Sequence, residues 1–314
     1  MTRQYAIIGT GAIGGYYGAL LQKAGFPVHF LLRSDYAIAR DRGLTLQSIN
    51  GDFKLPQILA YNDPAKMPPC DVILIALKAT QNHLLPQILP PILHPNSIVI
   101  LLQNGISTEP EIAKIPGINT IIGGICSICC YKIAPVTFQH LAYGEITLGE
   151  YVPNYQPCGI TPILKQISAD FQKAKISVET TANLIKRRWQ KLVWNIPYNS
   201  LSVILDATTT ELMEHPHSRQ FIRETMQEVL LAATATHCQI ADSYIQEMLD
   251  HTDNIKTPYL TSMKLDYNNY RPLEIEVILH NPLKIAQTAN IELPKIRALY
   301  QQLKFLSDRH YSNS

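Results

Sequence analysis

The chain has 314 residues, of which 46% are hydrophobic and 17% are charged. That length is enough to bury a substantial core in each of two domains of ordinary size. The formal net charge is only +2 and the basic residues are scattered, which excludes a surface built to grip nucleic acid or an anionic membrane. The sequence shows neither a secretory signal nor about 18 consecutive apolar residues, so we expect a cytoplasmic protein with reduced cysteines.

The first half of the chain alternates short apolar runs with helical patterns. Strands are predicted near residues 5–9, 28–33, 71–77, 97–103, 120–128 and 143–151. Strands that alternate with helices indicate a parallel sheet covered on both faces. Residues 43–56 predict an antiparallel hairpin, because Asn50-Gly51 is a strong two-residue turn signal.

After about Val178 the pattern changes to long helical periodicity, over residues 184–205 and 218–238, after Pro272 and again before the C-terminus. The predicted fold class is therefore α/β. An N-terminal Rossmann-type dinucleotide-binding domain is expected over residues 1–181, and a C-terminal all-α domain over residues 182–314.

A glycine-rich motif follows the first predicted strand and opens a helix, the context that marks a dinucleotide-binding turn. Gly9 would permit the tight turn, Gly11 would let a pyrophosphate approach the backbone, and Gly14 would let helix and strand pack closely. The predicted cofactor-binding residues of this motif are Gly9, Thr10, Gly11, Ala12, Ile13 and Gly14. A purely structural glycine loop is the alternative.

The second predicted strand ends at Arg33-Ser34, where an enzyme that uses NAD would place an acidic residue on the adenosine ribose. The guanidinium of Arg33 would instead pair with a 2′-phosphate, which favours NADPH over NADH. The alternative is a solvated Arg33, with Asp35 binding the ribose.

Lys78 and Asn104 follow the next two predicted strands of the sheet. Ligands bind at the carboxyl ends of parallel strands, so both are candidate contacts to the cofactor. Surface lysines and turn asparagines are also common for solubility and turn geometry.

Three polar residues recur every fourth position in the helical half: Lys191, Asn195 and Asn199. At this spacing they project toward one side of a helix, among apolar neighbours. Pro197 would kink that helix. A polar stripe that faces solvent is the alternative.

Glu274 and Ser262 are two further polar candidates downstream. Pro272 at a first helical position would make Glu274 a first-turn acid, whose ordinary role is to complement the helix dipole. Ser262 would ordinarily be a polar group of a helix or turn.

These residues together resemble the ketopantoate reductase family over nearly the whole chain. The resemblance is carried by GTGAIG, LLRS, ALKATQN, LLQNG, the run from His140 to Gly149, KLVWNIPYN, and SM followed by LEIE. It implies NADPH-dependent reduction of 2-dehydropantoate to pantoate, on the route to pantothenate and coenzyme A, by a cytoplasmic monomer or homodimer.

The resemblance also implies residue roles. Lys191 would be the general acid and Glu274 its polar partner, and an ammonium there would protonate and stabilise the developing alkoxide. Asn104, Asn195, Asn199 and Ser262 would hold the substrate, and the cofactor set would add Arg33, Lys78, Asn104 and Glu274 to the glycine motif.

Two positions depart from the family pattern: Tyr259 stands where many relatives have Asn, and Leu279-His280 where Asn-Gly is usual. Two alternatives therefore stay open. One is a related reductase of another small 2-keto or 3-hydroxy acid, and the other is a non-catalytic NADPH-binding regulator. Cys126, Cys129 and Cys130 lie in an apolar run without a second ligand pair, so we expect no metal site.

Overall fold

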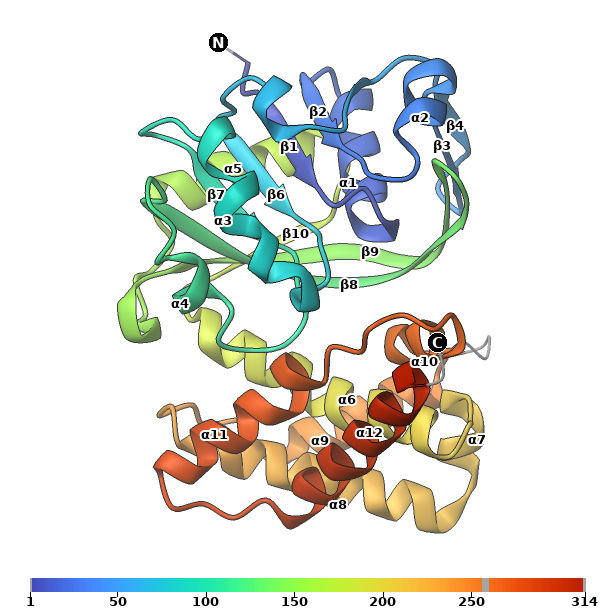
Figure 1. Cartoon of the computed structure of the whole chain (residues 1–314). Coiled ribbons are helices and arrows are strands. Elements are labelled where there is room, and N and C mark those ends of the chain that lie inside the picture. The colour runs from blue at the N-terminus through green and yellow to red at the C-terminus, as the bar shows by residue number, and fades with distance from the viewer. Residues whose placement is uncertain (1, 256–259, 313–314) are drawn as a thin grey trace. The chain divides into compact units, whose positions relative to one another are not determined.

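The computed structural model describes residues 2–255 and 260–312, which form two compact units (Figure 1). One unit comprises the residues up to Gln103 together with Thr108–Leu184. The other comprises Asn104–Ser107 together with the residues from Ile185 onward. The chain thus passes from the first unit to the second three residues after the predicted boundary at 181, because the strand β10 (Val178–Thr181) still pairs with the sheet.

The N-terminal unit is built on a ten-stranded sheet. Its other strands are β1 (Tyr5–Ile8), β2 (Val28–Leu31), β3 (Leu44–Ser48), β4 (Phe53–Leu55), β5 (Leu59–Tyr61), β6 (Val72–Ile75), β7 (Ile98–Leu101), β8 (Thr120–Ala134) and β9 (Thr137–Tyr151). Its helices are α1 (Ala12–Lys23), α2 (Tyr36–Arg42), α3 (Leu85–Ile88), α4 (Glu109–Ile112) and α5 (Pro162–Lys173).

Six strands of the sheet are parallel; five of them, β1, β2, β6, β7 and β8, were predicted, whereas β5 was not, and the strand predicted at 143–151 belongs to β9. The spatial order of the six parallel strands is β5-β2-β1-β6-β7-β8, which is third, second, first, fourth, fifth and sixth along the chain. This is the order of a Rossmann fold. The predicted hairpin is also confirmed, since β3 and β4 pair antiparallel with Leu44 opposite Leu55. Its turn differs from the predicted one, because the Gly51 N–H donates to the Ser48 carbonyl at 2.8 Å and Ile49-Asn50, not Asn50-Gly51, are the central residues.

Outside the predicted hairpin the sheet was expected to be parallel, and β8 and β9 depart from this expectation. These strands have 15 residues each and pair antiparallel along most of their length. They turn at Pro135-Val136, where Val136 has φ +48°. Glycine and asparagine are the usual signals of such a turn, and neither is present here.

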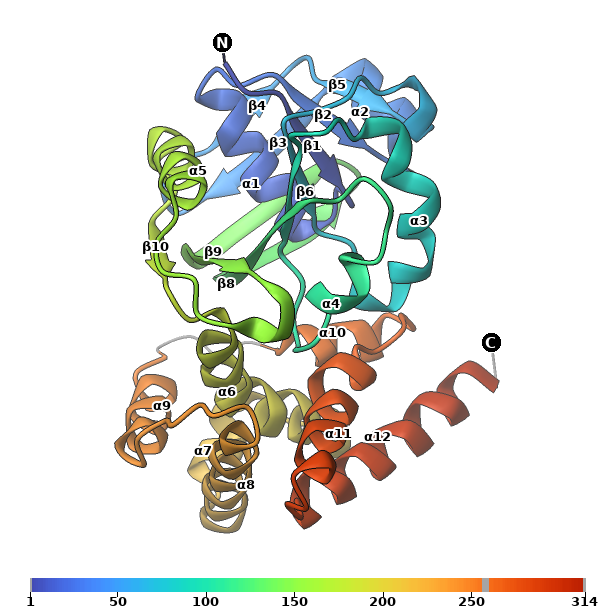
Figure 2. The ribbon, with the colours of Figure 1, turned by 90° about the vertical axis from the view of Figure 1, so that its left-hand side faces the viewer.

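The sheet buries both faces, because alternate residues of a strand point to opposite sides. Tyr5 and Ile7 of β1 belong to a core with residues of α1 and α5. Ala6 and Ile8 of the same strand belong to a second core, with residues of α3 and α4. Figure 2 shows α5 and α3 on opposite sides of the sheet.

The C-terminal unit is helical, as predicted. It contains α6 (Leu184–Ile204), α7 (Thr209–Glu214), α8 (Pro216–Thr234), α9 (Ser243–Asp253), α10 (Ser262–Asn268), the π-helical turn η5 (Glu276–His280), α11 (Asn281–Thr288) and α12 (Pro294–Ser312). Helix α6 is continuous through Pro197. Trp189 anchors α6 in the core: it is fully buried, and its indole N–H donates to Thr236 Oγ1 at 2.8 Å.

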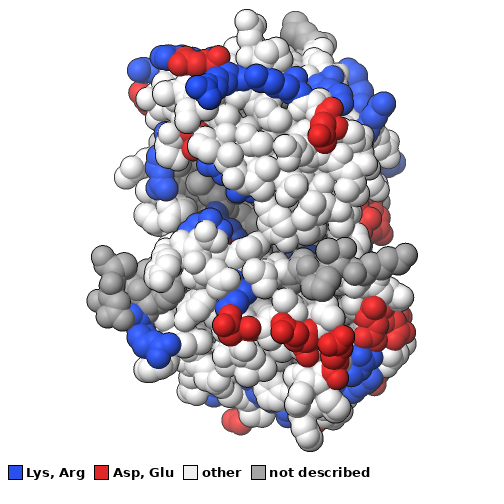
Figure 3. All heavy atoms as spheres, turned by 90° about the vertical axis from the view of Figure 1, so that its right-hand side faces the viewer, with Lys and Arg blue, Asp and Glu red and all other residues white. Residues whose placement is uncertain are grey.

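Both signs of charge occur on the face shown in Figure 3, among many uncharged residues, which fits the small net charge. Among the described residues, no helix combines the length and the apolar character that crossing a membrane requires.

Asp35 ties the start of α2 to the tip of the β8–β9 ribbon. Its carboxylate accepts hydrogen bonds from the Val136 backbone N–H at 3.0 Å and Ser34 Oγ at 3.1 Å, and pairs with Lys132 Nζ at 2.6 Å. Burial raises the pKa of this carboxyl, but the contacts from Lys132 and Val136 outweigh it and leave the pKa below its ordinary 3.8. Asp35 is therefore held as an anion.

We predict that Asp35→Asn lowers the free energy of unfolding at neutral pH by about 1.5–3 kcal/mol, because charged hydrogen bonds are lost. The folded-state pKa is depressed, so the anion's contribution is complete above pH 3.8 and disappears as the pH falls through the folded value. Urea unfolding as a function of pH measures this. The difference between variant and wild type should shrink below about pH 4.

Asp41→Asn is the matched control, because Asp41 is exposed and its ion pair is with its neighbour in the chain, Arg40. It should change stability little at any pH. An Asp35→Asn effect that is the same at acid and neutral pH would contradict a role for the charge.

Candidate functional site

The glycine motif lies at the carboxyl edge of the parallel strands. It connects β1 to α1, and the hydroxyl of Thr10 donates to the Leu31 carbonyl at the end of β2. Gly11 is the N-cap of α1, with no side-chain hydrogen bond and no acidic residue in the first turn. The positive end of the helix dipole is thus left available to an anion.

The three glycines of the motif differ in what surrounds them. Gly9 has φ +95°, and a Cβ there would lie 2.6 Å from the Leu77 backbone N. A Cβ on Gly14 would lie 2.2 Å from the Gly9 carbonyl O, so α1 packs directly on the turn. A Cβ on Gly11 would meet no described atom within 4 Å. Protein packing explains Gly9 and Gly14, whereas Gly11 leaves space beside the helix N-terminus.

Arg33 follows β2 at the same edge of the sheet, and its side chain is exposed. The neighbouring Asp35, the alternative ribose ligand, is buried and engaged with Lys132 and Val136. Of these two residues, Arg33 is the one available to a ligand. Lys78 follows β6 at this edge and is partly buried at the start of the 3-10 helix η2 (Ala79–Leu84).

Gln103 bonds the segment that follows β6, a role that the sequence reasoning missed. Its side-chain amide donates to the Leu77 carbonyl at 2.9 Å and to Asn82 Oδ1 at 2.6 Å. It thereby joins the end of β7 to the segment after β6. The only local signal was a polar residue that directly follows a buried strand.

In the helical unit, α6 carries Lys191, Asn195 and Asn199 on successive turns. Lys191 is partly buried, whereas Asn195 and Asn199 are 4% and 2% exposed. The alternative of a stripe that faces solvent is therefore wrong for the two asparagines. Asn199 Oδ1 is buried without a hydrogen-bond partner in the described part of the chain. An unpaired buried acceptor is costly, so this oxygen suits a donor on a ligand.

Ser262 is connected to α6 through its neighbour. Thr261, the N-cap of α10, accepts a hydrogen bond from the Lys264 N–H, and its hydroxyl lies 2.7 Å from Ser202 Oγ on α6. Ser202 in turn donates to the carbonyl of Asn199 at 3.2 Å. This chain of contacts sets exposed Ser262, the first residue of α10, relative to Asn199. Tyr259, the first departure from the family pattern, lies outside the described residues.

Glu274 lies beside Asn104 in the same unit. Asn104 Nδ2 donates to Glu274 Oε2 at 3.2 Å, and Glu274 is 4% exposed. The expectation of a first-turn acid is wrong, because residues 271–274 are not helical and the helical backbone begins at Ile275. Proline fits extended backbone as well as a first helical turn, and the Glu274 carboxylate faces an amide.

The second departure, Leu279-His280, serves packing within the helical unit. Leu279 is fully buried. The His280 ring stacks on Tyr300 of α12 with centroids 5.0 Å apart.

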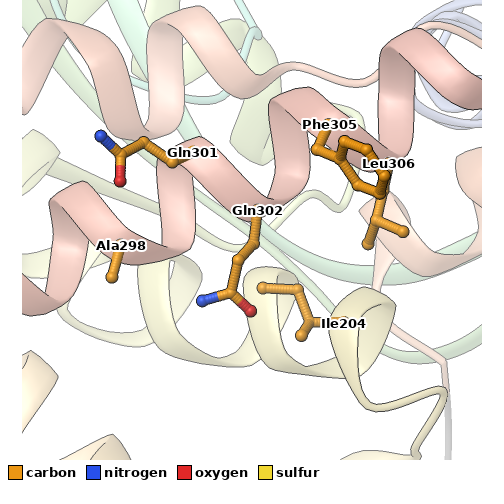
Figure 4. A pocket seen from close by; sticks show the side chains of 6 residues that line it. All are labelled: Ile204, Ala298, Gln301, Gln302, Phe305 and Leu306. Atoms are coloured by element: carbon orange, nitrogen blue, oxygen red, sulfur yellow. The ribbon is translucent and has the colours of Figure 1, made fainter.

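A separate pocket of about 410 Å³ lies between α12 and the end of α6 (Figure 4). The described residues that line it are uncharged and supply neither an acid nor a base; they are Ile204, Ala298, Gln301, Gln302, Phe305 and Leu306.

The cysteines of the apolar run belong to β8. None of the six cysteines, all of which are described, forms a disulfide. Burial raises the pKa of the Cys130 thiol to about 12, so this thiol is not activated. Within residues 2–255 and 260–312, no three His, Cys, Asp or Glu side chains are placed to hold a metal ion.

Comparison with known proteins assigns both units. The family model described as ketopantoate reductase PanE/ApbA matches residues 5–153, and the model of its C-terminal region matches residues 183–307. The chain belongs to the ketopantoate reductase family. It is 55% identical to a 2-dehydropantoate 2-reductase of Nostoc sp. over 308 residues, which is 98% of this chain and 96% of the relative.

Two solved structures show how far the likeness extends. The 2-dehydropantoate 2-reductase of Geobacter metallireducens matches with a TM-score of 0.92 and 37% identity, over 96% of this chain and 99% of that one. D-mandelate dehydrogenase with NADH and anilino(oxo)acetate matches with a TM-score of 0.87 but only 19% identity, over 98% and 99%. That second likeness concerns the fold alone.

We predict that Gly11→Ala folds as the wild type does but binds NADPH at least about tenfold more weakly, a loss of about 1.4 kcal/mol. The new methyl group would occupy the space beside the α1 N-terminus. Gly14→Ala is the contrasting variant, because its Cβ would clash with the Gly9 carbonyl. It should lose about 1–3 kcal/mol of stability.

Thermal unfolding and a fluorescence titration with NADPH measure both effects. Unchanged NADPH affinity in a stable Gly11→Ala variant would refute a phosphate site at this turn.

Proposed function

We propose that this protein catalyses the NADPH-dependent reduction of 2-dehydropantoate to pantoate. The observation that carries the proposal is the identity with the Nostoc enzyme over nearly the whole of both chains. The buried, unpaired Oδ1 of Asn199 and the Asn104–Glu274 pair support it, because they supply polar groups suited to a small hydroxylated acid.

The residues at the strand ends fit the dinucleotide. Backbone N–H groups at the start of α1 would hold its pyrophosphate, and the open space at Gly11 allows that approach. Exposed Arg33 would pair with the 2′-phosphate through its planar guanidinium. Lys78 and Asn104 would contribute further polar contacts. When bound, NADPH supplies the hydride that reduces the keto carbon.

The chain's own residues would orient the acid and deliver the proton. The ammonium of Lys191 donates a proton to the carbonyl oxygen as negative charge develops there. Asn199 Oδ1 accepts a hydrogen bond from the substrate hydroxyl. The amide N–H groups of Asn195 and the hydroxyl of Ser262 donate to the carboxylate, which only accepts. Glu274 holds Asn104 by its carboxylate and serves as the polar partner of Lys191.

The departure at Leu279-His280 does not argue against this substrate. A buried leucine and a histidine stacked on Tyr300 fill packing positions, so they need not contact a keto acid. The proposed partner of the protein is therefore the small keto acid, and a cytoplasmic location stays a prediction.

We predict that Lys191→Ala lowers kcat for 2-dehydropantoate by about 10²–10⁴-fold, the usual contribution of a positioned acid. NADPH affinity should change little, because the proton is needed only in the chemical step. Lys165→Ala, which changes an exposed lysine of α5, is the matched control and should retain full activity. The loss of NADPH absorbance measures turnover.

Wild type must be assayed with NADPH and NADH and with a panel of small 2-keto acids. Turnover of another acid alone would keep the mechanism and replace the substrate. Tight NADPH binding without any turnover would favour a regulator. Full activity of the Lys191→Ala variant would show that Lys191 is not the general acid.

Arg33→Ala should raise KM for NADPH by about 10–100-fold, since hydrogen bonds to charged groups contribute about 1.5–3 kcal/mol. KM for NADH should stay the same, because NADH lacks the 2′-phosphate. Arg42→Ala, which changes an exposed arginine of α2, controls for the loss of positive charge. An equal rise of KM for NADPH and for NADH would show that Arg33 does not bind the 2′-phosphate.

A further inference from the structure

The segment Asn104–Ser107 is packed with the helical unit, although the residues on either side of it belong to the N-terminal unit. Both backbone polar groups of Ile106 are bonded there. Its N–H donates to the Val277 carbonyl at 3.0 Å, and its carbonyl accepts from Asn281 Nδ2 at 2.8 Å. The Ile106 side chain is fully buried. We call these contacts among Ile106, Val277 and Asn281 the clasp.

The π-helical turn η5 explains why the Val277 carbonyl is available. In an α-helix it would accept from the N–H of Asn281, four residues on. Here the Asn281 N–H bonds the Glu276 carbonyl, five residues back, as a π-helix requires. The corresponding donor for Val277 would be residue 282, a proline, which has no N–H. The turn and Pro282 together leave a carbonyl for Ile106.

Gly105 permits the close approach. It has φ +86°, and a Cβ there would lie 2.5 Å from the Val277 carbonyl oxygen. Any other residue would be strained and would also push the segment away from η5. The approach of backbone to backbone thus depends on glycine.

The clasp lies directly beside the Asn104–Glu274 pair. Asn104 precedes Gly105 in the chain, and the Glu274 carbonyl accepts from the Ile278 N–H of η5 at 3.2 Å. The same turn therefore bonds the backbone of Glu274 and the segment that carries Asn104. This arrangement limits how far the Asn104 amide can move from the Glu274 carboxylate.

We propose that Asn281, Gly105 and the turn η5 with Pro282 are a positioning device for Asn104. They act on the reaction through the Asn104–Glu274 pair and touch neither substrate nor cofactor. The inference rests on the proposed function, in which Asn104 serves substrate and cofactor.

Asn281→Ala tests the clasp. We expect kcat/KM for 2-dehydropantoate to fall by at least about tenfold, which corresponds to about 1.4 kcal/mol. Asn254→Ala is the matched control, because Asn254 Nδ2 also donates to a backbone carbonyl, that of Asp250, at 2.8 Å. It should keep wild-type kcat/KM. A general loss of stability would be common to both variants, whereas the kinetic loss would be confined to one.

A double-mutant cycle with Asn104→Ala gives the decisive readout. If Asn281 acts through Asn104, then Asn281→Ala should change kcat/KM less than about twofold in the Asn104→Ala background. If the two substitutions instead lower kcat/KM independently, so that their fold-changes multiply in the double variant, the proposal is overturned. A stable Asn281→Ala variant with unchanged kcat/KM would also overturn it.

Gly105→Ala should repeat the Asn281→Ala phenotype. Gly51→Ala is its control, because Gly51 also has a positive φ, +106°, but its Cβ would meet no described atom within 4 Å. Equal kinetic effects of the two glycine variants would attribute the loss to backbone strain and reject the clasp.

Two further measurements, hydrogen exchange of the Ile106 amide and NADPH affinity, test the clasp without using the substrate. The Ile106 amide should exchange at least about tenfold faster in Asn281→Ala than in wild type. If wild type and Asn254→Ala do not turn over 2-dehydropantoate, the proposed function fails. The same double-mutant cycle, measured as NADPH affinity, then tests the clasp. Losses of affinity that are not additive in free energy support it. Unchanged NADPH affinity together with unchanged exchange of the Ile106 amide refutes it.

Discussion

The direct packing of α1 on the turn that follows β1 is the constraint on which the N-terminal unit depends. At Gly14 the helix approaches the Gly9 carbonyl so closely that a single methyl group would separate them. This contact sets the start of α1 at the carboxyl edge of the sheet, where the parallel strands also bring Arg33 and Lys78. Space remains at Gly11 alone among the three glycines. The proposed dinucleotide phosphate site would thus arise from the packing requirements of one strand and one helix.

The helical unit uses a different principle, because its polar groups are positioned by contacts between distant segments. Ser202 and Thr261 relate Asn199 of α6 to Ser262, and η5 relates Glu274 to Asn104. In the first case hydroxyl groups fix the position of a polar side chain, and in the second the backbone of η5 does so. Two buried polar atoms of α6, Asn199 Oδ1 and Ser200 Oγ, have no hydrogen-bond partner among the described residues, and the proposed site uses Asn199 Oδ1.

Local patterns predicted much of this molecule. The glycine motif, five of the six parallel strands, the β3–β4 hairpin and the helical second half all have strong short-range signals, whereas the short strand β5 was not predicted. The β8–β9 ribbon had no such signal, because its turn lacks glycine and asparagine. The non-helical backbone at Glu274 and the bonds of Gln103, Ser202 and Asn281 were also missed. Each depends on a partner far away in sequence, or on a proline that allows two backbone conformations. The roles of Lys191 and Ser262 came from the family resemblance, which spacing alone does not supply.

The membership of Asn104–Ser107 in the helical unit bears on how this protein can be divided. Two family models match the two halves separately, as if one cut near residue 183 would release two modules. Yet the chain enters the helical unit at Asn104, leaves it after Ser107 and returns at Ile185. A fragment from Ile185 onward would expose the Val277 carbonyl and the Asn281 amide, and the complementary fragment would carry an unanchored loop. Evolutionary exchange of the C-terminal half between relatives therefore has to preserve a match with four residues encoded in the other half.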